Sequence, residues 1–110
     1  MSASFTAVRD VPPDHPAFAG HFPGRPIWPG VLLLAEVMEA LRGAPALAAA
    51  LGERPSIAAA KFLAPVRPAS RLDIVLTPAA GGGAGLGFEV RCGATLVASG
   101  RLVAAEEGAV

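Results

Sequence analysis

The segment Val31–Arg42 constrains the fold most, because it is aliphatic around most of its helical circumference. It contains no proline or glycine, and Gly43 follows it as a C-terminal cap. At about 100° per residue, Glu36, Glu39 and Arg42 occupy only about a third of the helix surface. A helix that is apolar on most sides must be enclosed on most sides, so we expect it at the centre of the fold.

The rest of the chain predicts mainly strands, because its apolar residues recur with a period of two. A short second helix is expected at Ala44–Leu51, with Gly52 after its end. The glycine-rich run Gly81–Gly85 precedes a strand and not a helix, so it predicts a hairpin loop and not a phosphate site. The predicted strands are Ser4–Val11, Ile57–Leu63, Leu72–Thr77, Leu86–Cys92 and Thr95–Ala104.

One apolar helix followed by consecutive antiparallel strands is typical of an α+β fold, with a sheet of about five strands wrapped around the helix. The length of 110 residues fits a single domain over residues 1–110. Hydrophobic residues make up 53% of the chain and charged residues only 16%. This is more apolar surface than the core of so small a domain can bury. We therefore expect a dimer or larger assembly in which an edge strand pairs with a second copy. The alternative is that the high hydrophobic fraction only reflects a composition biased toward alanine and indicates no interface.

Charge and residue counts exclude several classes of function. Nine basic and nine acidic residues cancel, so the sequence indicates neither a nucleic-acid surface nor a polybasic membrane patch. A single cysteine, Cys92, excludes an internal disulfide and belongs to the predicted core; no metal site and no cofactor are indicated. No apolar stretch is long enough to span a membrane and no signal peptide is recognised, so we expect a cytoplasmic protein.

The chemical signal lies in the run Gly20–Gly30, which reads Gly-His-Phe-Pro-Gly-Arg-Pro-Ile-Trp-Pro-Gly. Its prolines make it stiff, which suits a site that holds a side chain in fixed geometry. His21 can take and return a proton near neutral pH, although a lone loop histidine satisfied by backbone groups is the alternative. The helix that starts at Gly30–Val31 has no Ser, Thr, Asp or Asn cap, so its first amides can hold a carbonyl oxygen that gains negative charge. Removing a proton α to a thioester carbonyl requires these two groups together.

The run from Phe18 to Leu32 closely resembles the signature of the (3R)-hydroxyacyl-acyl-carrier-protein dehydratases, Gly-His-Phe-Pro-Gly-x-Pro-x-x-Pro-Gly-Val. Downstream, the run Lys61–Pro68 is similar to that family's strand after the helix. The resemblance implies a hot-dog fold, in which an antiparallel sheet wraps one central helix and the motif lies at the helix mouth. The short segment before the motif is more similar to the compact dehydratases of specialised pathways, such as those encoded in aryl polyene clusters.

The resemblance also implies roles for individual residues. His21 would shuttle the proton as water leaves a β-hydroxyacyl thioester carried on acyl carrier protein, in fatty acid, lipid or polyene-type biosynthesis. The backbone of Gly30 and Val31 would bind the thioester carbonyl. Phe22 and Trp28 would line the substrate site, although packing of Trp28 against the domain is an equal alternative.

Basic residues near the motif are candidates for contact with an acidic carrier protein. Arg25 lies inside the motif, with Arg67 and Arg71 behind it; a solvated arginine is the alternative. His15, on the approach to the motif, is expected at the surface.

The predicted helix departs from the family pattern at one position. The family places an acidic residue five positions after the Pro-Gly glycine, and this chain has Ala35 there. Glu39 points only about 40° from the Ala35 direction, whereas Glu36 points about 100° away, so geometry favours Glu39 if a helix carboxylate serves the site. The alternative is that both glutamates are solvated or paired with Arg42.

Three hypotheses follow from these residues. The first is a dehydratase acting on hydroxyacyl thioesters, as a homodimer or as a heterodimer with another hot-dog chain. The second is a hot-dog thioesterase that uses the same helix end with a water nucleophile. The third, motivated by Ala35, is a non-catalytic subunit that completes the site of a partner.

Overall fold

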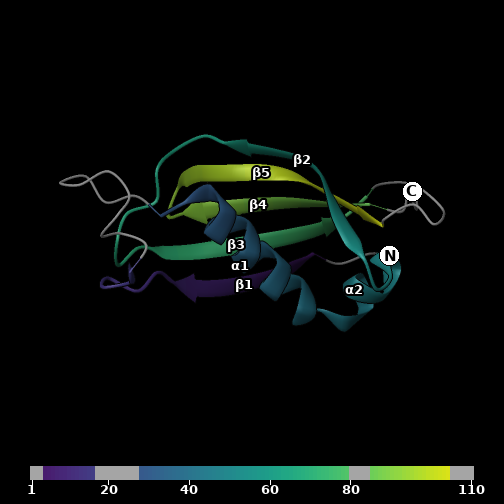
Figure 1. Ribbon diagram of the computed structural model, residues 1–110. Helices are drawn as coiled ribbons and strands as arrows, with labels where there is room; N and C mark the ends of the chain where they lie inside the picture. The colour runs from purple at the N-terminus through teal and green to yellow at the C-terminus, as the bar shows by residue number, and fades with distance from the viewer. Residues whose placement is uncertain (1–3, 17–27, 80–84, 105–110) are drawn as a thin grey trace.

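The computed structural model describes residues 4–16, 28–79 and 85–104. A five-stranded sheet is crossed on one face by a single long helix (Figure 1). The elements are β1 (Phe5–Asp10), α1 (Gly30–Arg42), α2 (Pro45–Leu51), β2 (Pro55–Phe62), β3 (Arg71–Pro78), β4 (Leu86–Cys92) and β5 (Thr95–Ala104). Every helix and strand expected from the sequence is present, so the α+β prediction is confirmed.

All strand pairs are antiparallel, in the order β1-β3-β4-β5-β2. Strands β4 and β5 are joined by a tight turn at Gly93, whose φ of 61° lies in the left-handed region that favours glycine. Strands β3 and β4 meet with Pro78 opposite Leu86, as expected for a hairpin. Most of the glycine-rich connection, residues 80–84, lies outside the described residues.

The core lies between α1 and the face of the sheet that the helix crosses (Figure 1). Side chains alternate along the central strands, and the inward set is almost completely buried. Helix α1 adds Leu33, Val37, Ala40 and Leu41 to this core. Burying one such aliphatic side chain contributes about 1.5–3 kcal/mol, so the packing fixes where the helix lies. The inward strand residues are Leu72, Ile74, Leu76, Leu86, Phe88, Val90 and Leu102.

Helix α1 is less enclosed within one chain than the sequence predicts. Val31 is 72% exposed, and Ala35, Glu39 and Arg42 continue an exposed stripe along the helix. The physical reason is that one sheet layer covers only the side of the helix that faces it. The apolar positions on the opposite side are therefore left to solvent or to another chain.

The two edges of the sheet are β1 and β2. In β2 every residue from Ser56 to Phe62 is exposed, and its middle consists of alanines. An edge strand with small side chains presents its backbone hydrogen-bonding groups without obstruction, so β2 is the edge better suited to pairing with another chain.

A turn before β3 forms backbone hydrogen bonds with Val11, the residue directly after β1. Ser70 N donates to Arg67 O at 3.3 Å, Ala69 N donates to Val11 O at 3.1 Å, and Val11 N donates to Ser70 O at 2.8 Å. Ala69 has a φ of 64°, which makes it the one non-glycine residue with positive φ in the described ranges. Alanine in this region is strained by about 1–2 kcal/mol.

We expect the substitution Ala69→Gly to raise the free energy of unfolding by about 0.5–1 kcal/mol, because relief of strain outweighs the added freedom of the unfolded chain. Urea denaturation followed by circular dichroism measures this change. The matched control is Ala60→Gly in β2, where φ is negative and glycine should lower stability. Equal destabilisation by both substitutions would show that Ala69 carries no strain.

Candidate active site

The start of α1 supplies two amides that precede the first hydrogen bonds of the helix. Leu32 N and Leu33 N both donate to Pro29 O, at 3.0 and 3.1 Å, and Pro29 gives no side-chain cap. The amides of Gly30 and Val31 therefore come before the helical ladder, at the positive end of the helix dipole. This is the arrangement that the sequence predicts for holding a carbonyl oxygen.

A groove of about 520 Å³ lies beside this helix start. One wall is formed by Trp28, Gly30 and Leu33, and the other by the last residue of β2 and the segment that follows it. A hydrogen bond joins the two walls, because Trp28 N donates to Val66 O at 2.7 Å. Every side chain on these walls is apolar, so the groove suits a hydrocarbon chain. The second wall consists of Phe62, Leu63, Ala64, Pro65 and Val66.

Trp28 packs against the domain, which is one of the two alternatives that the sequence left open, and its role toward a substrate stays a prediction. It lines the groove, and it is only 6% exposed because it packs into the core. The ring of His15 meets it edge-on, with ring centroids 4.8 Å apart and planes at 78°. His15 is half-buried, so the expectation of a surface histidine needs correction: its ring packs against the buried ring of Trp28.

The two helix glutamates each have a cationic partner. Glu36 Oε1 lies 3.4 Å from Arg9 Nε on β1, and Glu39 Oε2 accepts a hydrogen bond from Arg42 Nη1 at 2.8 Å. The Glu39 pair is one of the alternatives that the sequence left open, whereas the Glu36 pair reaches a strand far away in the chain. Both pairs are partly exposed, and such pairs are worth at most about 1 kcal/mol, so neither fixes its carboxylate firmly.

Three predicted site residues lie in residues 17–27, outside the described residues: His21, Phe22 and Arg25. Their roles stay predictions. Arg67 and Arg71 are described, and both are exposed.

Phe62 is a groove residue that the sequence did not single out. Its ring lies against Gly30, so closely that a Cβ built on that glycine would be 3.0–3.3 Å from three ring carbons. The sequence feature that could have indicated this groove residue is an aromatic side chain near the end of a predicted strand, within the run Lys61–Pro68 that resembles the dehydratases.

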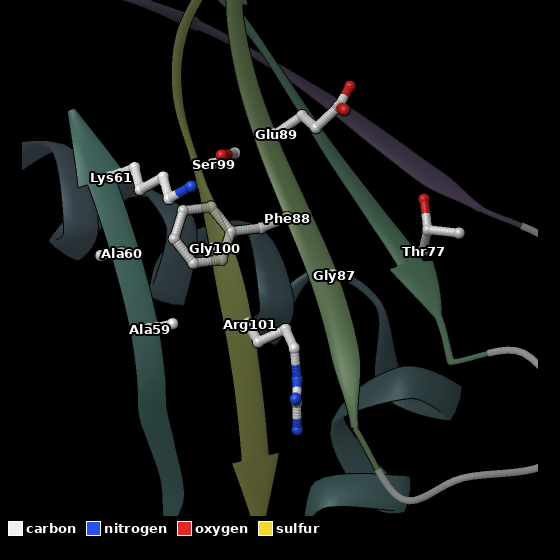
Figure 2. Close-up of a pocket in the computed structure, with 10 residues that line it drawn as sticks. All are labelled: Ala59, Ala60, Lys61, Thr77, Gly87, Phe88, Glu89, Ser99, Gly100 and Arg101. Atoms are coloured by element: carbon white, nitrogen blue, oxygen red, sulfur yellow. The ribbon is translucent and has the colours of Figure 1, made fainter. Parts of the chain in front are cut away.

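A second depression, also of about 520 Å³, lies across strands β2, β5, β4 and β3 (Figure 2). Lys61, Glu89 and Arg101 contribute charged side chains to it (Figure 2). Glu89 alternates with the inward-facing Phe88, so this charged surface belongs to the face of the sheet turned away from α1. None of the residues predicted to form the site lines it.

The helices in the described part of the chain are too short or too polar for any of them to cross a membrane. Within the same ranges, no group of three or more His, Cys, Asp and Glu side chains is placed to hold a metal ion. Cys92 is half-buried and packs against the core, as the sequence predicts.

The chain is similar to known dehydratases in sequence. It is 40% identical over 86 residues to the 3-hydroxyacyl-[acyl-carrier-protein] dehydratase FabZ of Aliarcobacter butzleri, a match that covers 70% of this chain and 58% of that protein. It is 38% identical over 116 residues to FabZ of Verminephrobacter eiseniae, covering 88% of this chain and 75% of that protein. The chain thus spans little more than half the length of the first relative.

The chain is also similar to a solved structure. A chain of the dehydratase heterocomplex ApeI:P from Xenorhabdus doucetiae superposes with a TM-score of 0.71 at 24% identity, covering 91% of this chain and 85% of that one. This likeness confirms the hot-dog fold. The ApeI-like family, described as ApeI dehydratase, matches residues 2–101. This protein therefore belongs to the ApeI-like dehydratase family.

Proposed function

We propose that this protein removes water from (3R)-hydroxyacyl thioesters carried on acyl carrier protein. The observation that carries the proposal is the uncapped start of α1, where the amides of Gly30 and Val31 precede the helical hydrogen bonds and Gly30 lines an apolar groove. The sequence places His21 nine residues before Gly30, in the run that leads into this helix. Proton transfer and carbonyl binding are the two functions that this reaction needs.

In the proposed reaction, His21 takes a proton from the carbon α to the thioester carbonyl. The amides of Gly30 and Val31 stabilise the negative charge that develops on the carbonyl oxygen. The electron pair then forms a double bond between the α and β carbons, and the bond from the β carbon to its hydroxyl oxygen breaks. His21 returns the proton to that oxygen, which leaves as water. The apolar walls hold the acyl chain and keep bulk water away from the reacting carbons.

The acidic partner that the family places on this helix has to come from elsewhere. Ala35 is exposed and carries no carboxylate, and Glu39, one turn further along the same stripe, is paired with Arg42. We propose that a second hot-dog chain completes the site, either a copy of this chain or a different one. The open edge of β2 and the exposed stripe on α1 support such an assembly.

The carrier protein would deliver the thioester from the side of the histidine-containing run. Exposed Arg67 and Arg71, with Arg25, are the basic groups proposed to meet its acidic surface. A cytoplasmic location is part of the same proposal, because the substrate is carried on a carrier protein used in biosynthesis.

Ala35 favours one second candidate, a non-catalytic subunit that binds the acyl chain and completes the site of a partner. The two candidates differ in whether His21 of this chain transfers the proton. Formation of the enoyl product by the purified chain alone supports the dehydratase. If a second hot-dog chain is required, loss of that joint activity in His21→Ala of this chain supports the dehydratase, and its retention supports the non-catalytic subunit.

We expect His21→Ala to lower kcat for dehydration at least about 100-fold, because it removes the proton-transfer group. Formation of the enoyl thioester is followed by its ultraviolet absorbance. The matched control replaces the other histidine of the chain: His15→Ala should change kcat less than about tenfold, because His15 packs against Trp28 and transfers no proton. Retention of full activity in His21→Ala would contradict the proposed function.

We expect Ala35→Glu to raise the activity of the isolated chain about tenfold or more, because it restores a carboxylate at the family's position. Ala35→Gln has a similar size without the charge and serves as the control. The opposite pattern, no gain from Ala35→Glu together with loss of activity in Glu39→Gln, would show that Glu39 already serves the site.

A further inference from the structure

The ring of Phe62 occupies the space directly against the α-carbon of Gly30. Its three outermost ring carbons lie 3.0, 3.1 and 3.3 Å from the position that a Cβ on Gly30 would take. The two amides proposed to bind the thioester carbonyl belong to Gly30 and its neighbour Val31. When the thioester carbonyl binds to these amides, the α-carbon of the acyl chain, which is bonded to the carbonyl carbon, would therefore lie close to the edge of this ring.

The backbone beneath the ring is fixed. Phe62 pairs with Ala98 on β5, and the next two amides, those of Leu63 and Ala64, donate to Val97 O at 2.8 and 3.3 Å. The side chain is held less tightly, because it is 53% exposed. A change of its rotamer would move the ring without disturbing the strand.

The opposite wall of the groove is rigid by comparison. Trp28 is 6% exposed and Leu33 only 3%, and both belong to the packed core. Closely packed core side chains cannot give way without loss of packing energy. The width of the groove beside Gly30 therefore depends on the position of the Phe62 ring.

We propose that Phe62 is a specificity-determining residue that limits the bulk accepted at the α-carbon of the acyl thioester. The inference rests on the proposed carbonyl site at Gly30 and Val31. A straight chain, with two hydrogens on its α-carbon, fits between the ring and the core wall. A chain with a methyl branch at that carbon must displace the ring, so it binds more weakly and reacts more slowly.

The test compares two unreactive ligands: straight-chain and α-methyl-branched acyl pantetheines in which an amide replaces the thioester. Calorimetry gives both Kd values, and the fluorescence of Trp28, the single tryptophan of the chain, reports whether the ligand enters this groove. We expect the unaltered protein to prefer the straight chain about tenfold, the scale of one methyl group in an apolar pocket. In Phe62→Ala the preference should disappear, and in Phe62→Leu it should be intermediate.

Two further variants separate this role from general damage to the fold. Val8→Ala removes another partly exposed apolar side chain, on β1 and away from the groove, and should leave the preference unchanged. Gly30→Ala should weaken straight-chain binding severalfold in the parent, because the new methyl pushes the ring, but not in the Phe62→Ala background. Circular dichroism confirms folding of each variant.

The outcomes distinguish this inference from the proposed function. Binding of both ligands with an unchanged preference in folded Phe62→Ala overturns the role of Phe62 and leaves the dehydratase proposal intact. A loss of preference in Val8→Ala as large as that in Phe62→Ala also overturns it. Failure of every variant and of the unaltered protein to bind either ligand overturns the proposed carbonyl site, and with it the inference.

Discussion

The position of α1 against one face of the sheet determines the rest of the structure. Leu33, Val37, Ala40 and Leu41 are held by a continuous apolar surface of the central strands, so the helix can neither slide nor rotate without exposing them. This packing brings the helix start beside the segment after β2, where the hydrogen bond from Trp28 N to Val66 O locks the two together. The groove lies between the helix start, which the core holds, and the run from Phe62 to Val66, whose backbone is held by β5 and by this hydrogen bond.

The fold could be predicted because its signals are local. A change from helical to alternating periodicity is present in the chain itself, and Gly43, Gly52 and Gly93 end or turn elements where the sequence indicates. Strand β2 begins earlier than expected, at Pro55, because a proline indicates a strand boundary in the sequence but is tolerated as the first residue of an edge strand. The enclosure of α1 was overestimated for a different reason: residue type shows what can be buried, but not whether one chain supplies enough surface to bury it.

The candidate site likewise has local features that could be predicted and long-range contacts that could not. The uncapped helix start was predictable, since it depends only on the residues around Gly30, and so was the pairing of Glu39 with Arg42 one turn later. The contact of Phe62 with Gly30 and the ion pair of Arg9 with Glu36 join residues far apart in the chain. Such contacts follow from the tertiary packing, so neither composition nor spacing contains them.

The missing cap at Pro29 has a consequence for how this protein can be stabilised. A serine or aspartate at this position would cap the helix and add about 1 kcal/mol of stability, because its side chain would accept hydrogen bonds from the amides that follow. Those bonds would form at the helix end where the carbonyl is proposed to bind. Thermal robustness and ligand affinity are therefore opposed at this helix end, and selection for stability alone would erode the binding site while leaving the fold unchanged.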